Sequence, residues 1–143
     1  MSELHKFIFE GLPVRGIVVR LTDTWTEILR RRASNSEHGA YAAPVREMLG
    51  EMVAAGVLMQ SSIKFDGALV LQIMGDGPVK LAVVEVQSSL ELRATATVLQ
   101  PVPDGATLSQ MVNVNNQGPL RHYAGPANQV SWPAALPGRG AAV

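Results

Sequence analysis

The spacing of apolar residues predicts a strand and then a helix in the first third of the chain. Residues 14–21 alternate between two sides, as a half-buried strand does. Thr22 or Thr24 then caps a helix, and the second choice places Glu27 three residues on, which completes a capping box. The arginines at 30–32 fall in the last turn of this helix, where cations complement the helix dipole.

A second helix is predicted from Pro44, because proline lacks the N–H that a first helical turn leaves unpaired. Apolar residues recur after it at intervals of three and four, which marks one buried face. The residues of this stripe are Val45, Met48, Leu49, Met52, Val53, Gly56 and Met59. Small residues lie among the large ones, so we expect this helix to approach a sheet closely.

From residue 62 the period changes to two, which is typical of strands. Residues 63–65 alternate, and the Asp66-Gly67 pair after them is a hairpin signal. Further strands are predicted at residues 68–74, 79–86 and 90–98. The predicted fold class is α+β, an antiparallel β-meander sheet packed against at least two helices.

Two of these strands are apolar on both sides, unlike a strand that has one face in water. The helices supply a cover for one face, and the second face needs another. We leave two alternatives open: a layer made by residues 99–114 and the amino-terminal segment, or a surface that binds a second subunit or a client protein. The candidate client or dimer surface consists of Val70, Met74, Ala82, Val84 and Val86.

Composition divides the chain and limits its chemistry. Only Asp104, Arg121 and Arg139 carry charge in the last third of the chain, so we predict an incomplete core domain at residues 1–117 and an irregular tail at 118–143. The 12 basic and 12 acidic residues balance, which argues against nucleic acid as a partner, and no apolar run is long enough to span a membrane. The absence of cysteine removes disulfides and cysteine-based zinc sites. We expect a cytoplasmic protein.

The histidines and glycines do not form a recognisable site. His5, His38 and His122 lack the short spacing that brings two imidazoles to one metal ion. The Gly75-Asp76-Gly77-Pro78 segment leads into a predicted strand, whereas a phosphate-binding loop leads into a helix. We therefore predict no metal and no nucleotide cofactor in this chain.

The charged residues have ordinary structural explanations. Asp66 and Asp76 belong to predicted turns and Glu85 to a strand end, so they are not a catalytic carboxylate pair. The arginines at 30–32 read as a solvated helix end, because no aromatic platform for nucleic acid accompanies them. We predict that the chain is not an enzyme.

Several short motifs, in this order, resemble one known family. They are Leu4-His5-Lys6-Phe7-Ile8-Phe9, Val14-Arg15-Gly16, Pro44-Val45, Lys64-Phe65-Asp66-Gly67, Gln72-Ile73-Met74-Gly75-Asp76-Gly77-Pro78, Leu81-Ala82-Val83 and Met111-Val112-Asn113. Together they resemble the N-terminal core domain of the heat shock protein 33 family, the redox-regulated bacterial holdase chaperones, over residues 3–117.

The resemblance implies an ATP-independent chaperone of the bacterial cytoplasm that binds unfolded client proteins through apolar surface and can form homodimers. Family members also have a C-terminal domain in which four cysteines, in CxC and CxxC pairs, bind zinc and form disulfides on oxidation. This sequence contains no cysteine, so none of those residues is carried over and zinc is not expected here.

The resemblance ends at Gly118, and we hypothesise a truncated or frame-shifted product whose last residues are translated out of frame. We expect the apolar surface to stay uncovered and therefore to bind unfolded proteins constitutively or to self-associate. The alternative to an active chaperone core is an inactive structural fragment or a self-associating interaction domain.

Overall fold

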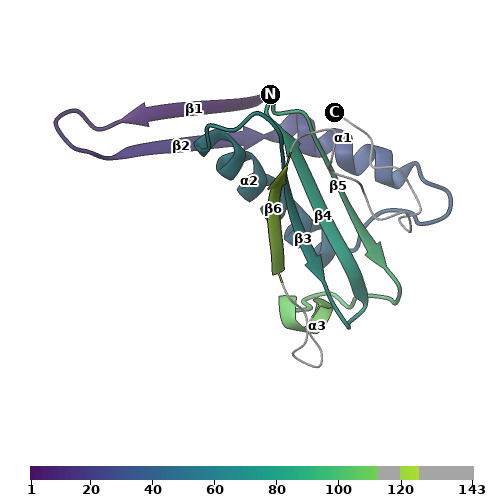
Figure 1. Ribbon diagram of the computed structural model, residues 1–143. Coiled ribbons are helices and arrows are strands. Elements are labelled where there is room, and N and C mark those ends of the chain that lie inside the picture. Colours follow the sequence, from purple (N-terminus) through teal and green to yellow (C-terminus); the bar gives the residue numbers. More distant parts are fainter. Residues whose placement is uncertain (113–119, 126–143) are drawn as a thin grey trace.

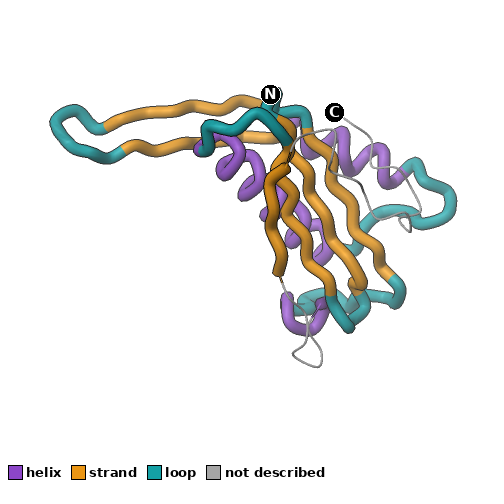
Figure 2. The backbone as a smooth tube through the Cα atoms, viewed as in Figure 1, coloured by secondary structure: helices purple, strands orange, loops and turns teal. Residues whose placement is uncertain are grey.

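The computed structural model describes residues 1–112 and 120–125, which form two antiparallel sheets and three helices (Figure 2). One sheet has the strand order β1-β2 and the other β5-β4-β3-β6, so the predicted α+β fold is confirmed. The elements in chain order are β1 (Ser2–Ile8), β2 (Arg15–Leu21), α1 (Thr22–Ala33), α2 (Ala43–Ser62), β3 (Ala68–Met74), β4 (Val79–Gln87), β5 (Leu92–Val98), α3 (Leu108–Val112) and β6 (Leu120–Gly125).

Strands β1 and β2 form a hairpin that projects from the rest of the molecule (Figure 1). Their pairing runs from Ser2 opposite Leu21 to Ile8 opposite Arg15. We call these two strands and the turn of residues 9–14 between them the arm. Strand β2 confirms the predicted strand, whereas β1 was not predicted, because the run from Lys6 to Phe9 lacks a clean alternation.

Helix α1 begins without the capping box that its sequence suggested. Leu21 occupies the N-cap position, and Thr24 already lies inside the helix. The Thr24 backbone N–H donates instead to the Ser2 Oγ of β1 at 3.0 Å, so a neighbouring strand satisfies this helix end. Glu27 points toward the end of the helix and accepts hydrogen bonds from Arg30 and Arg31.

Helix α2 packs its predicted apolar stripe against the four-stranded sheet. Its first turn contains Pro44, as expected, and every residue of the stripe is buried except Met59. Gly56 permits the close approach, because a Cβ there would lie 3.1 Å from the Val86 side chain and 3.4 Å from that of Val84. The main core therefore lies between α2 and one face of the sheet.

The predicted strand at residues 63–65 and its hairpin are wrong. Helix α2 continues to Ser62, and the chain then runs without regular structure to the start of β3. A hairpin partner for β3 on this side is not needed, since β3 is paired with β4 along one edge and with β6 along the other. The strands predicted at 68–74, 79–86 and 90–98 are confirmed, the last one starting two residues late at Leu92.

Of the two alternatives for the second sheet face, the layer made by residues 99–114 and the amino-terminal segment is wrong as far as these residues are described. Met111 and Val112 of α3 join the main core, and Leu4 of β1 packs against the same core. The Val112 carbonyl accepts a hydrogen bond from the Asp76 N–H at 3.2 Å, which holds the end of α3 beside the turn between β3 and β4. Neither residues 99–112 nor β1 therefore forms a layer on the opposite face.

Part of the segment that we expected to be irregular is a strand. Residues 120–125 form β6, which pairs antiparallel with β3 from Ile73 opposite Leu120 to Ala68 opposite Gly125. The prediction of an irregular tail is wrong for these residues. The remainder of 118–143 lies outside the described residues, and the domain boundary after residue 117 stays a prediction.

Candidate functional site

The structure does not bring the five predicted surface residues together. Ala82, Val84 and Val86 of β4 are buried in the main core beneath α2. Val70 and Met74 of β3 lie on the other face, because Val70 is opposite Glu85 and Met74 is opposite Leu81. The expectation that Ala82, Val84 and Val86 share an accessible face with the other two is therefore wrong. A client contact by Val70 and Met74 stays a prediction.

That second face carries a small apolar cluster beside an ion pair. Val70, Leu81 and Val83 are buried together, and Met74 is 41% exposed. Next along the face, the buried Glu85 carboxylate accepts hydrogen bonds from Nε and Nη2 of Arg93 at 2.9 and 2.6 Å. This paired geometry satisfies a carboxylate that would otherwise be costly to bury. The pair explains Glu85 as a structural residue.

The histidines are separated in the fold as they are in the sequence. His5 lies on β1, where its Nε2 is 3.0 Å from the Glu3 carboxylate, and His38 lies in the loop before α2. His122 is placed by the backbone opposite Leu71. Within residues 1–112 and 120–125 no group of three or more histidine or acidic side chains is placed to hold a metal ion.

The arginines at 30–32 are largely engaged within their own region. Arg30 and Arg31 bind Glu27, and the hydrogen bond from Arg30, with a second from Arg31, lowers the Glu27 pKa from 4.5 to about 2. The Arg32 guanidinium lies 4.3 Å from the centre of the Tyr41 ring and donates to the Gly39 carbonyl. These contacts support the interpretation of this cluster as a helix end.

The most conspicuous exposed apolar surface is on the arm. Six large apolar side chains are solvent-exposed on the arm, with Ile8 80% exposed and Leu12 61% exposed; five lie in or beside the turn, and Val18 lies opposite His5 in the middle of the hairpin. The six residues are Phe7, Ile8, Phe9, Leu12, Val14 and Val18. We call this set the arm tip. Phe7 and Val18 lie on one face of the hairpin and Ile8 on the other. Single exposed apolar residues are normal on a surface, but six on one short hairpin indicate a binding surface.

The aromatic residues of the arm tip hold one another in place. The rings of Phe7 and Phe9 meet edge to face, with centroids 5.8 Å apart and planes at 75°. The Phe7 ring also lies across Gly16 on β2, where a Cβ would overlap it. Two backbone hydrogen bonds close the turn, from Phe9 N–H to the Val14 carbonyl and from Leu12 N–H to that of Phe9. The arm therefore presents its apolar residues on an ordered hairpin.

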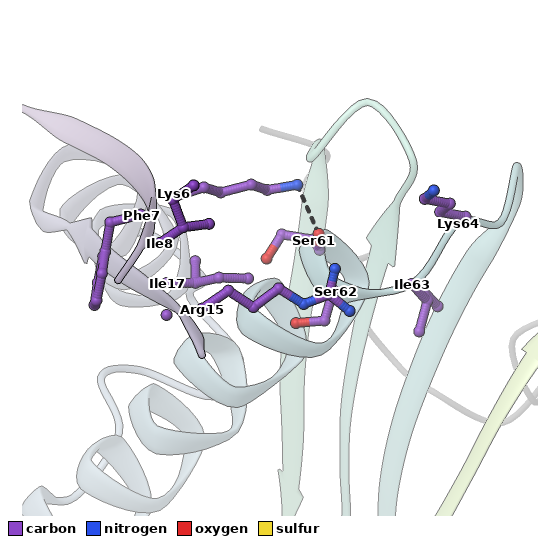
Figure 3. A pocket seen from close by; sticks show the side chains of 10 residues that line it. Lys6, Phe7, Ile8, Arg15, Ile17, Ser61, Ser62, Ile63 and Lys64 are labelled. Carbon is purple, nitrogen blue, oxygen red and sulfur yellow. Dashed lines mark hydrogen bonds between the residues drawn. The ribbon is translucent and has the colours of Figure 1, made fainter. Parts of the chain in front are cut away.

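A cleft of about 670 Å³ separates the underside of the arm from the end of α2 (Figure 3). Lys6 of β1 reaches across it, and its Nζ donates to the Ser61 carbonyl at 2.8 Å. A cation is favourable there, because the last carbonyls of a helix carry partial negative charge. Ile8 and Ile17 of the arm and Ile63 after α2 add apolar surface to the cleft.

Sequence reasoning missed the arm tip because an exposed hairpin leaves no burial pattern. One signal was present: the apolar run from Phe7 to Phe9 and the apolar Val14 flank a segment with Gly11 and Pro13, residues that favour turns. Gly11 has φ = 75°, a conformation that glycine adopts readily. An apolar run joined by turn residues to the alternating strand at 14–21 predicts a hairpin even though the first run does not itself alternate.

The chain is similar to one family of known proteins. A family model described as Hsp33 protein matches residues 2–133, beyond residue 117, where the resemblance was expected to end. The chain is 49% identical to the 33 kDa chaperonin of Chromobacterium violaceum over 95 residues, which cover 66% of this chain and 30% of that protein.

Other relatives give a similar picture. The chain is 37% identical to the 33 kDa chaperonin of Serratia proteamaculans over 111 residues, which cover 78% of this chain and 36% of that protein. The chain is also 40% identical to the 33 kDa chaperonin of Actinobacillus pleuropneumoniae over 111 residues, which cover 78% of this chain and 35% of that protein. The chain thus spans about a third of the length of these relatives.

None of the described helices is long and apolar enough to cross a membrane.

Proposed function

This chain belongs to the Hsp33 family, and from that premise we propose that it acts as an ATP-independent holdase chaperone that binds unfolded client proteins through apolar surface. The observation that carries the proposal is the exposed arm tip. An unfolding protein exposes apolar segments, and burying apolar area releases about 25 cal/mol per Å². A group of exposed apolar side chains on an ordered hairpin therefore offers such segments a place to bind.

The loop at residues 75–78 supports a mechanism that does not require a nucleotide. This segment leads directly into strand β4 rather than into the N-terminus of a helix. A phosphate-binding loop needs that helix, because its backbone N–H groups and dipole hold the phosphates. We propose that client binding here depends on apolar contact and not on a catalytic or nucleotide-driven step.

We also propose that client binding by these 143 residues does not itself require zinc. These 143 residues contain no cysteine, so neither a thiolate zinc site nor a disulfide switch can be built from them. The arm tip is exposed without any such change. The bacterial cytoplasm is the compartment that we propose for this chaperone.

Suppression of aggregation tests the proposal. A client protein is heated until it scatters light, with and without this chain, and the intact chain is expected to reduce the scattering. The variant Leu12→Ser is compared with Leu99→Ser, since these leucines are 61% and 66% exposed but lie on the arm tip and on the body. We expect the first change to weaken protection and the second to leave it unaltered. Equal protection by both variants, and by a triple Ile8→Ser/Phe9→Ser/Leu12→Ser variant, would overturn the role of the arm tip.

The same exposed residues favour a second candidate, self-association without client binding. Two arm tips can bury each other's apolar side chains, which would give homodimers or larger species. Analytical ultracentrifugation separates the two candidates. A chaperone remains able to bind client at a concentration where it is monomeric or dimeric, whereas a purely self-associating domain grows in size and gives no protection. A chain that neither associates nor protects is the inactive fragment.

A further inference from the structure

A second groove lies on the body and shares no lining residue with the cleft beneath the arm. It has a volume of about 460 Å³ and runs along α2, with β3 and the segment leading into α3 on its other side. Leu71 and Ile73 contribute from β3, and Leu108, which is exposed, lies at the α3 side. This volume falls within the range of pockets that bind ligands.

Four of the six methionines of the chain line this groove. Met48, Met52 and Met59 come from α2 and Met111 from α3. Methionine is flexible and polarisable, and surfaces rich in it adapt to different apolar side chains. Met48, Met52 and Met111 are buried between the groove and the main core, whereas Met59 is 39% exposed, so Met59 and Leu108 supply the accessible apolar surface of the groove. A lining of this kind suits a partner helix whose apolar residues differ in shape.

The rim of the groove is acidic. Glu47 and Glu51 are exposed, lie one turn apart on α2, and make no ion pair with the described residues. Two like charges at this spacing repel each other and weaken a helix slightly. None of the described lining residues is basic. A cationic partner would relieve this repulsion while its apolar side chains fill the groove.

We propose that this groove binds an amphipathic helix that carries lysine or arginine beside its apolar face. The lining from Pro44 to Met59 extends over about 22 Å of α2. A partner helix of about 15 residues has that length, and lysines one turn apart on it would lie opposite Glu47 and Glu51. The site differs from the arm tip, and binding here does not require that the proposed holdase function be correct.

Fluorescence anisotropy with two labelled peptides tests the proposal. Both peptides have leucines at helical spacing, and the remaining positions are lysine in one and glutamate in the other. We expect the intact chain to bind the lysine peptide about tenfold more tightly than the glutamate peptide, with the difference shrinking as salt is added. The double change Glu47→Lys/Glu51→Lys should reverse this preference.

A matched control changes charge elsewhere. The variant Glu37→Lys/Glu91→Lys shifts the net charge equally, and both residues are exposed and lie outside the groove. It should keep the preference for the lysine peptide, as should the arm-tip variant Leu12→Ser. The proposal is overturned if the two charge-reversal variants behave alike or if the intact chain binds both peptides equally. It is also overturned if neither peptide binds and the groove variant instead abolishes a dimer, which would make a second copy the occupant.

Discussion

The arm and the body use apolar residues in opposite ways. In the body, β3 and β4 place apolar side chains in the main core, in which Val79, Ala82, Val84 and Val86 have no exposed surface. In the arm, two strands pair only with each other in the described part of the chain, and apolar side chains near their far end stay in water. The difference indicates that the body supplies stability while the arm tip is available for binding.

Truncating one leucine in each region should give the largest contrast. Leu49→Ala removes a fully buried side chain from α2 and should lower the free energy of unfolding by about 2–5 kcal/mol. Leu12→Ala on the arm tip should change it by less than about 0.5 kcal/mol. Urea unfolding followed by circular dichroism measures both values. Similar losses for the two variants would mean that the arm tip is part of the core.

Two glycines, one in the body and one in the arm, allow the two regions to be compared through smaller changes in stability. At Gly75 a Cβ would overlap the Val112 carbonyl, so Gly75→Ala should displace α3 from the sheet and lower the free energy of unfolding by about 1–3 kcal/mol. At Gly11 a Cβ meets no atom within 4 Å, but φ is 75°. Gly11→Ala should therefore cost about 1–2 kcal/mol within the arm alone.

Amide hydrogen exchange distinguishes the two glycine variants. Exchange should quicken around α3 and the main core in Gly75→Ala, and only in β1 and β2 in Gly11→Ala. Faster exchange of the sheet amides in the Gly11→Ala variant would show that the arm and the body unfold as one unit, contrary to this account.

The smallest expected effect is a loss of stability at acidic pH that arises in α1, the helix between the arm and the body. The folded-state pKa of Glu27 is depressed from 4.5 to about 2 by hydrogen bonds from Arg30 and Arg31. Its contribution to stability is therefore fully present above about pH 4.5 and is lost as the pH falls toward 2. Thermal unfolding between these pH values should be less pH-dependent in Glu27→Gln than in the intact chain. An identical pH dependence of Glu27→Gln and the intact chain would show that Glu27 does not stabilise the protein through its low pKa.

The body could be predicted from the sequence far better than the arm. Both ends of strand β3 were predicted correctly, and the predicted buried stripe of α2 was wrong only for Met59. These predictions succeeded because the spacing of apolar residues depends directly on which side of an element is buried. The prediction of which side chains share a face of the sheet was wrong, because it depends on the register between the paired strands β3 and β4. Leu69 is opposite Val86, so a shift by one residue would exchange the faces.

The arm tip was harder to predict for a physical reason. A strand whose apolar residues stay in water has no buried face to impose alternation. The turn at residues 9–14, which joins β1 to its partner β2, was therefore the remaining sequence signal for the arm. The acidic rim of the second groove could not be predicted either, because the spacing of Glu47 and Glu51 does not distinguish a groove rim from an ordinary solvated side of a helix.

The central claim is that the arm tip is where an unfolding client binds. The most direct measurement places a photo-activated cross-linking residue at position 12 or at position 99 and irradiates the chain with a client protein during its thermal unfolding. Both positions are exposed, so reactivity alone does not distinguish them. The account predicts strong cross-linking to the unfolding client from position 12, little from position 99, and none from either to the folded client. Equal cross-linking from both positions, or none from position 12, would contradict it.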